Sequence, residues 1–87
     1  MKHVIAFDVS MGKHYIVVYN ALKTCIVEKE IQHTREDFAA LKLLIDDLTA
    51  GYDEVPHLVF ESTGVYSRQL ERFMQENSYP YYLMNPL

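Results

Sequence analysis

Two apolar segments, far apart in the sequence, each carry one acidic residue at or near their end. Residues 4–10 read Val-Ile-Ala-Phe-Asp-Val-Ser, with the acid at Asp8, and residues 57–61 read His-Leu-Val-Phe-Glu, with the acid at Glu61. A carboxylate inside or just after a buried strand costs free energy unless something offsets its charge, and a metal ion is a common offset. The same arrangement twice in a short chain indicates a shared site.

Apolar runs and alternating patterns predict the strands of this chain. Residues 2–9 are almost continuously apolar, which is typical of a strand buried on both faces. β-branched, aromatic and alternating stretches predict the other strands, at residues 14–20, 24–32, 57–60 and 79–84. In the third of these five strands, Cys25, Val27, Lys29 and Ile31 are expected on one face.

Capping residues and apolar stripes predict two helices. The first is expected at residues 35–50, with Thr34 as its N-cap and Gly51 at its end. Its apolar stripe consists of Phe38, Leu41, Ile45 and Leu48. The second helix is expected at residues 66–75, opened by Gly64 and with Tyr66, Leu70 and Phe73 facing inward.

The element order is therefore β-β-β-α-β-α-β, an α/β fold. Strand-helix-strand crossovers join parallel strands and are almost always right-handed. We therefore expect a mixed five-stranded sheet in the order 3-2-1-4-5, with the first three strands antiparallel. Asp8 and Glu61 then meet at the carboxyl ends of neighbouring parallel strands, where ligands bind in open α/β sheets.

Composition limits the classes of protein to consider. The 87 residues allow one domain or less, and no apolar run approaches the length of a membrane span. The amino terminus lacks the pattern of a signal peptide, and the single Cys25, interpreted as a small core residue, fits a reducing cytoplasm. A net charge of −4 disfavours a dedicated nucleic-acid-binding module, so contact with a polynucleotide needs metal ions or a basic partner.

Three motifs occur together in this chain. The first segment ends Phe-Asp-Val-Ser, residues 60–66 read Phe-Glu-Ser-Thr-Gly-Val-Tyr, and residues 82–87 read Tyr-Leu-Met-Asn-Pro-Leu. In this combination the chain resembles the amino-terminal portion of the DEDD-type, RuvC-like transposases of bacterial insertion sequences, the IS110 class. The resemblance covers residues 2–87.

The resemblance implies a ribonuclease H-like (RuvC-like) fold, with residues 1–87 as the amino-terminal part of a catalytic domain. It implies Asp8 and Glu61 as catalytic residues and ligands of Mg²⁺ or Mn²⁺, with two further acidic ligands downstream. The activity implied for the full-length protein is DNA strand cleavage and transfer during transposition. DNA is the implied partner, a guide RNA a further candidate, and the 87-residue chain alone is expected to be inactive, with metal bound only weakly.

Each acidic residue also has a local structural interpretation. The Asp8 carboxylate could accept the amide of Ser10 or Met11 in a turn, and Glu61 could accept amides of the turn at residues 63–64, where Thr63 is read as an N-cap. The four histidines show no metal-ligand spacing and are interpreted as surface or strand residues. Tyr79, Tyr81 and Tyr82 could stack on bases, but their alternation favours packing on both sides of a strand.

Three basic residues are candidates for nucleic-acid contact. Lys13 follows the Asp8 segment, where a solvated hairpin is the competing interpretation, and Arg68 and Arg72 lie four apart on the second helix. The arginines could instead pair with Glu71 and Glu76.

Two other functions compete with the transposase. An actin-like or sugar-kinase-like phosphotransfer fold also opens with a strand ending in Asp, although residues 10–13 offer one glycine where a Gly-rich hairpin is expected. The third possibility is a truncated remnant that folds and self-associates without catalysis. Because a sheet covered on one side leaves apolar surface and edges exposed, we expect a homo-oligomer.

Overall fold

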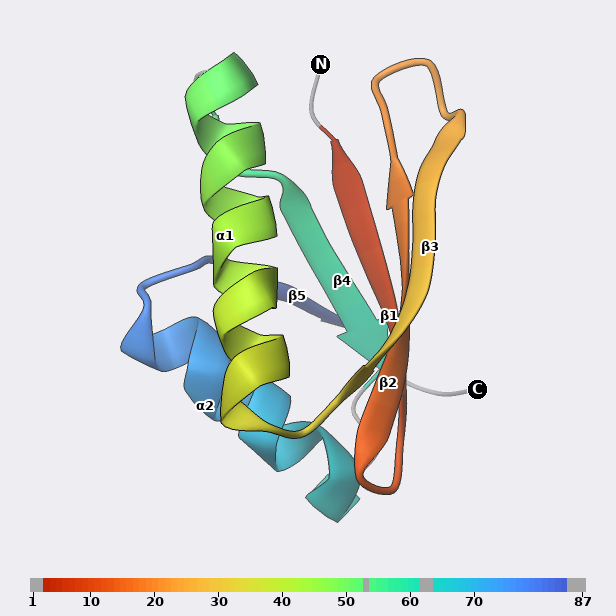
Figure 1. Cartoon of the computed structure of the whole chain (residues 1–87). Coiled ribbons are helices and arrows are strands. Elements are labelled where there is room, and N and C mark those ends of the chain that lie inside the picture. The colour runs from red at the N-terminus through yellow and green to blue at the C-terminus, as the bar shows by residue number, and fades with distance from the viewer. Residues whose placement is uncertain (1–2, 53, 62–63, 85–87) are drawn as a thin grey trace.

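One mixed five-stranded sheet, in the order β3-β2-β1-β4-β5, forms the centre of the molecule (Figure 1). The computed structural model describes residues 3–52, 54–61 and 64–84. The strands are β1 (Val4–Ser10), β2 (Lys13–Tyr19), β3 (Cys25–Gln32), β4 (His57–Glu61) and β5 (Tyr82–Met84). β1 pairs antiparallel with β2 and parallel with β4, β2 pairs antiparallel with β3, and β4 pairs parallel with β5. This α/β fold and strand order confirm the sequence prediction.

Both helices lie on the same side of the sheet in Figure 1. α1 spans Arg35–Tyr52, and a 3₁₀ turn η1 (Gly64–Ser67) leads into α2 (Arg68–Glu76). The Thr34 hydroxyl accepts the Asp37 amide at 3.2 Å, as expected of an N-cap, and the Asp37 carboxylate accepts the Gln32 amide at 2.6 Å. These two bonds connect the end of β3 and the N-cap to the first turn of α1.

The helix-covered face of the sheet holds the core. Alternate residues of β1, β2 and β4 point toward the helices, and the parallel register places Ile5 beside Leu58 and Phe7 beside Phe60. Leu41 and Ile45 of α1 and Leu70 and Met74 of α2 are fully buried against them, with no exposed surface. Because every second strand residue points the other way, Val4, Ala6, Val17 and Val59 are only half-buried on the open face.

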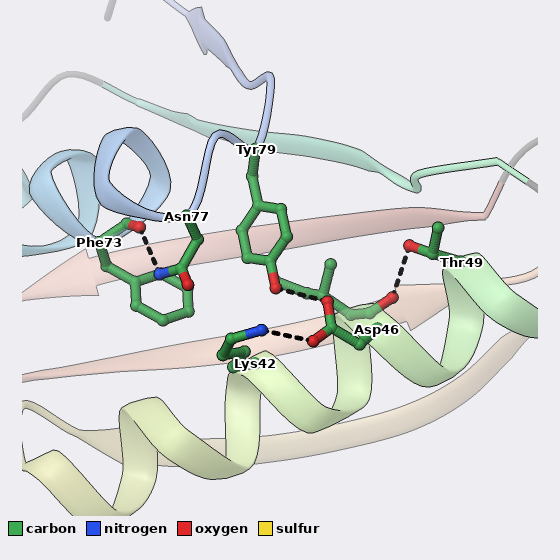
Figure 2. Close-up of polar contacts among 7 residues, drawn as sticks. Lys42, Asp46, Thr49, Phe73, Asn77 and Tyr79 are labelled. Carbon is green, nitrogen blue, oxygen red and sulfur yellow. Dashed lines mark hydrogen bonds and ion pairs between the residues drawn. The ribbon is translucent and has the colours of Figure 1, made fainter.

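A polar network ties α1 to the segment that precedes β5 (Figure 2). The Tyr79 hydroxyl donates to Asp46 Oδ1 at 2.6 Å, and Lys42 Nζ donates to Asp46 Oδ2 at 2.6 Å. Within α2 and its end, the Asn77 side chain donates to the Phe73 carbonyl at 2.9 Å. The hydrogen bonds from Lys42 and then Tyr79 lower the pKa of Asp46 from its ordinary value. The hydrogen bond of Tyr79 with Asp46 therefore links α1 to the segment between α2 and β5.

The prediction that Cys25 is a core residue is wrong, because its side chain is exposed. β3 is an edge strand, and among its residues only Ile31, near its carboxyl end, is fully covered. Lys29 pairs in register with the buried Ile16 but is itself exposed. Alternation predicts the correct face for Val27, Lys29 and Ile31, but a register shift between Val18 and Tyr19 pairs Cys25 with the exposed Tyr19 of the open face.

The prediction that Tyr66 faces inward is also wrong, since it is 44% exposed. Residues 64–67 form a 3₁₀ turn with about three residues per turn, so a stripe extrapolated at 3.6 residues per turn is out of phase there. Ser67 is buried instead and donates to the Glu71 carboxylate at 3.1 Å. Leu70 is buried as predicted, Phe73 is half-buried, and Met74 completes the inner face.

Smaller differences concern element ends and histidines. α1 continues through Gly51 to Tyr52, and β5 covers only Tyr82–Met84 of the predicted 79–84. Tyr79 and Tyr81 pack against the core, whereas Tyr82 is exposed. His14 is a strand residue, as the interpretation allows, and is fully buried; His3, which precedes β1, is also buried rather than at the surface. The predicted N-cap at Thr63 and the terminal Asn-Pro-Leu lie outside the described residues.

Candidate functional site

Asp8 and Glu61 lie side by side at the carboxyl ends of β1 and β4. The parallel register pairs Phe7 with Phe60, and the next residue on each strand is the acidic one. Both carboxylates lie on the open face, because Phe7 and Phe60 point into the core and successive strand residues alternate. Both side chains are exposed. The fold thus brings together the two residues that the sequence singles out.

A pocket of about 340 Å³ lies at this place, and both acidic residues line it. Its other walls come from β1, β4 and β5; the lining comprises Ala6, Phe7, Asp8, Val9, Val59, Phe60, Glu61 and Met84. Met84 pairs with Glu61 across the β4–β5 ladder, so β5 closes one side. The pocket is hollowed at the strand ends, where an open α/β sheet binds its ligands.

The local interpretation of Asp8 finds no support among the described residues. Within residues 3–52, 54–61 and 64–84, no hydrogen bond or ion pair engages the side chain of Asp8 or Glu61. The turn after β1 is held differently: the Ser10 hydroxyl donates to the Lys13 carbonyl at 3.3 Å, and Gly12 adopts a left-handed φ of 74°. The turn predicted to engage Glu61 is at residues 63–64, and Thr63 lies outside the described residues.

The three basic candidates occupy different places. Lys13 lies on the open face, in register with Ser10, and forms an ion pair with Glu30 at 3.2 Å. Arg72 lines a second pocket, between the start of α1 and α2, while Arg68 lines neither of the two pockets. The proposed pairs of Arg68 with Glu71 and of Arg72 with Glu76 do not form in the described part of the chain.

Sequence reasoning missed two features on the covered side. His14 is fully buried and its Nδ1 lies 2.8 Å from Nε2 of His33, with Nε2 of His14 unpaired among the described residues. Burial, and after it the neighbouring His33, lower the pKa of His14 from 6.5 to about 4, with Asp37 acting in the opposite direction. The alternation of His14, Ile16 and Val18 along β2 was the available signal for burial. The second missed residue is Arg35, which lines the second pocket together with Arg72.

A mixed sheet in this order, with paired acidic residues at the ends of β1 and β4, defines the RuvC-like, ribonuclease H-like class of α/β proteins. The family model for the DEDD transposases of the IS110 class, described as Transposase, matches residues 5–87. The chain therefore belongs to this transposase family, and DNA is the partner that membership implies. A search of the curated proteins finds no match. In the described part of the chain, no helix is long and apolar enough to cross a membrane.

The two acidic residues suit a hard divalent cation. Carboxylate oxygens are the ligands that Mg²⁺ and Mn²⁺ prefer, and both groups are exposed, unpaired in the described structure and lined up on one pocket. No cluster of three or more His, Cys, Asp or Glu side chains that could hold a metal forms among the described residues. Asp8 and Glu61 are therefore suited to bind a divalent metal ion as two members of a larger set of ligands.

Proposed function

We propose that this chain supplies Asp8 and Glu61 as ligands of the metal centre with which a DNA transposase cleaves and transfers strands. The observation that carries the proposal is the register of β1 and β4, which sets two exposed carboxylates side by side on one pocket. Membership of the transposase family supports it independently. A sugar-kinase-like phosphotransfer role loses its basis, because the family match identifies a different class.

Each part of the site has a separate task in this proposal. Bound divalent ions would activate the attacking oxygen and stabilise the leaving oxygen of a phosphodiester. The chain's own contribution is to hold its two carboxylates on adjacent, hydrogen-bonded strands, where backbone pairing limits their movement. Val59 and Met84 line the same pocket and place apolar surface beside Glu61. DNA is the proposed substrate; a guide RNA remains a prediction of the family resemblance.

Metal affinity should be weak in this chain. Two carboxylates leave most of the coordination sphere of a divalent ion to water, and Mg²⁺ gives up its waters reluctantly. Mn²⁺ forms stronger complexes with the same oxygen ligands, so we expect Mn²⁺ to bind more tightly than Mg²⁺. For the same reason we expect the 87-residue chain not to cleave DNA by itself.

Paramagnetic broadening by Mn²⁺ tests the assignment. In a titration followed by NMR, the amide resonances of Asp8, Glu61 and their strand neighbours should broaden first, and Asp8→Asn and Glu61→Gln should each reduce the effect. Asp47→Asn removes an exposed carboxylate from α1 and is the matched control. Broadening centred elsewhere, or unchanged in both site variants, rejects the metal site.

A cleavage assay tests the expectation of inactivity. Labelled DNA incubated with the chain and Mg²⁺ or Mn²⁺ should remain intact. If the chain nicks DNA and the Asp8→Asn variant does not, the expectation that two carboxylates are too few ligands for catalysis is wrong. If the chain does not cleave DNA and Mn²⁺ also fails to broaden the resonances of Asp8 and Glu61, the interpretation as a non-catalytic remnant is favoured instead.

Self-association through the open face is the accompanying proposal. This face exposes Tyr15, Tyr19, Tyr82 and Met84, and half-buried valines lie between them. Tyrosine and methionine are enriched in protein interfaces, and a second copy of the chain would cover both the apolar surface and the free sheet edges. Sedimentation should show a dimer or larger species, which Tyr15→Lys weakens; monomer throughout the micromolar range would rule it out.

A further inference from the structure

A second pocket, of about 270 Å³, lies between the start of α1 and α2 and is distinct from the one that Asp8 and Glu61 line. Its walls are residues 33–35, Phe38, Gln69, Arg72, Phe73 and Glu76. We call it the α1–α2 pocket. Its volume is just below the range typical of small-molecule sites, so it suits a single phosphate with an adjoining group rather than a cofactor.

Two arginines face this pocket from different elements. Arg35 begins α1 and Arg72 lies in the middle of α2, and neither forms an ion pair within the described residues. Glu76 contributes the one opposing charge, so the lining has an excess of positive charge in a chain whose net charge is −4. A guanidinium presents a planar set of donors that matches the oxygens of a phosphate. Two unpaired guanidinium groups around one hollow favour an anionic ligand.

Three aromatic rings line the pocket together with the arginines. The rings of Phe38 and Phe73 have centroids 5.1 Å apart, and His33 lies 5.8 Å from Phe38. Phe38, Phe73 and His33 are each only half-buried, so their ring surfaces remain partly accessible. Bases of unpaired nucleic-acid strands stack on such rings with little dependence on sequence. Arginine and aromatic side chains in one pocket therefore suit a nucleotide, with its phosphate beside the arginines and its base beside the rings.

The α1–α2 pocket and the carboxylate pocket lie at the same end of the sheet. Because β3 runs parallel to β1, the start of α1 follows β3 at the end where β1 and β4 carry Asp8 and Glu61 (Figure 1). The two pockets are on opposite faces of the sheet at that end. A polynucleotide passing around this end could reach both.

We infer that the α1–α2 pocket binds a backbone phosphate of an unpaired nucleic-acid strand, with Arg35 and Arg72 as its donors and Phe38 and Phe73 as the surface for the adjoining base. The identity of the ligand as nucleic acid rests on the proposed function. The anion-binding character rests on the pocket itself and does not require the metal centre.

NMR of the labelled chain tests the location. Inorganic phosphate and short oligothymidine are titrated separately, with a metal chelator present so that Asp8 and Glu61 contribute no metal-dependent binding. Both probes should shift the guanidinium N–H signals of Arg35 and Arg72, and oligothymidine should also shift the ring signals of Phe38 and Phe73. Phosphate shifts without oligothymidine shifts would overturn the assignment to a nucleic-acid strand, and shifts elsewhere would overturn the site. Oligouridine, run in parallel, distinguishes an RNA ligand from a DNA ligand.

Charge variants test the specificity. Arg35→Gln and Arg72→Gln should each weaken oligothymidine binding about tenfold, since each removes a charge-assisted hydrogen bond. The slope of log affinity against log salt should fall by about 0.7 for each phosphate that the variant no longer neutralises. Lys23→Asn, in the turn between β2 and β3, removes one positive charge at the opposite end of the sheet and should change binding by less than about twofold.

The Arg68→Gln variant distinguishes specific binding in the α1–α2 pocket from non-specific electrostatic attraction to α2. Arg68 lies four residues before Arg72 on α2 but outside the α1–α2 pocket, so its loss should weaken binding far less than the loss of Arg72. Equal losses in the two variants would overturn the proposal. A failure of the proposed function would be seen separately. In that case Mn²⁺ would not broaden the resonances of Asp8 and Glu61, whereas phosphate would still shift those of Arg35 and Arg72.

Discussion

The two faces of the sheet differ in what their side chains do, although the same strands supply both. On β4, Leu58 and Phe60 point under the helices and are almost completely buried, while Val59 is half-exposed and Glu61 is exposed. One face is therefore closed by helices and determines stability. The open face carries the carboxylate pocket and contributes less to the core. The period of two in a strand lets neighbouring residues serve these separate purposes.

The same contrast applies to ionisable groups. On the covered face, His14 is enclosed and its pKa is lowered to about 4, so its environment favours the neutral form. On the open face, Asp8 and Glu61 keep access to solvent and to ions. Protonation of a buried histidine at low pH lowers the stability of the fold, because the charged form is poorly solvated there. An exposed carboxylate remains available as a ligand.

Adjacent truncations on β4 should give the largest difference between the faces. Leu58→Ala removes a fully buried side chain and should lower the free energy of unfolding by about 2–5 kcal/mol. Val59→Ala, one residue further on, should cost about 1 kcal/mol or less, because its side chain is half-exposed. Urea denaturation followed by circular dichroism measures both. The comparison is made at a concentration at which sedimentation shows monomer, so similar losses for the two variants would mean that both faces are buried within one chain.

Acidification should destabilise the protein through His14. Its pKa is lower in the folded state than the ordinary 6.5, so the unfolded chain binds more protons between pH 6.5 and pH 4. The stability that neutral His14 provides is complete above about pH 6.5 and is lost as the pH falls toward 4. A shift of this size corresponds to about 3 kcal/mol.

The measurement is the difference between the pH profiles of wild-type protein and variants. His14→Phe should remove the loss attributed to this residue, while His57→Phe on the open face keeps His14 and should keep the loss. His33 and Asp37 are the groups that interact electrostatically with His14, and both remain in these variants. A His14→Phe profile parallel to that of the wild type would show that His14 is not the responsible group.

The sheet order could be predicted because local patterns and topological rules agree. A continuous apolar run, a short turn and two helical crossovers leave few ways to arrange five strands. The position of Cys25 could not be predicted, since strict alternation does not reveal the register shift between Val18 and Tyr19 that pairs Cys25 with an open-face residue. The exposure of Tyr66 could not be predicted either, because nothing in the sequence marks residues 64–67 as a 3₁₀ turn.

The candidate site shows the same division. Asp8 and Glu61 could be paired from the sequence, since residues at the ends of adjacent parallel strands converge whatever the details of packing. The α1–α2 pocket could not be predicted, because Arg35 and Arg72 come to line one pocket only through the angle between α1 and α2. That angle depends on side-chain packing, including the contact of Phe38 with Phe73. The pairing of His14 with His33 likewise requires three-dimensional placement.

Matched tyrosine variants should show a smaller difference between the faces. Tyr79→Phe removes the hydroxyl that donates to Asp46, which remains bound to Lys42, and should cost about 1 kcal/mol (Figure 2). Tyr82→Phe alters an exposed side chain on β5 and should change stability by less than about 0.5 kcal/mol. Thermal unfolding of both proteins provides the comparison. An equal effect would place the Tyr82 hydroxyl in an interface on the open face.

The smallest expected effect comes from neutralising the carboxylate pocket. Asp8→Asn and Glu61→Gln keep the size of each side chain, and no hydrogen bond or ion pair within the described residues depends on either carboxylate. Each should therefore change the free energy of unfolding by no more than about 0.5 kcal/mol without metal. With Mn²⁺ present, the wild-type chain should gain stability that the variants lack, because a ligand bound only to the folded state stabilises it. A loss of several kcal/mol without metal would instead make these residues structural, and the open face would then resemble the covered one.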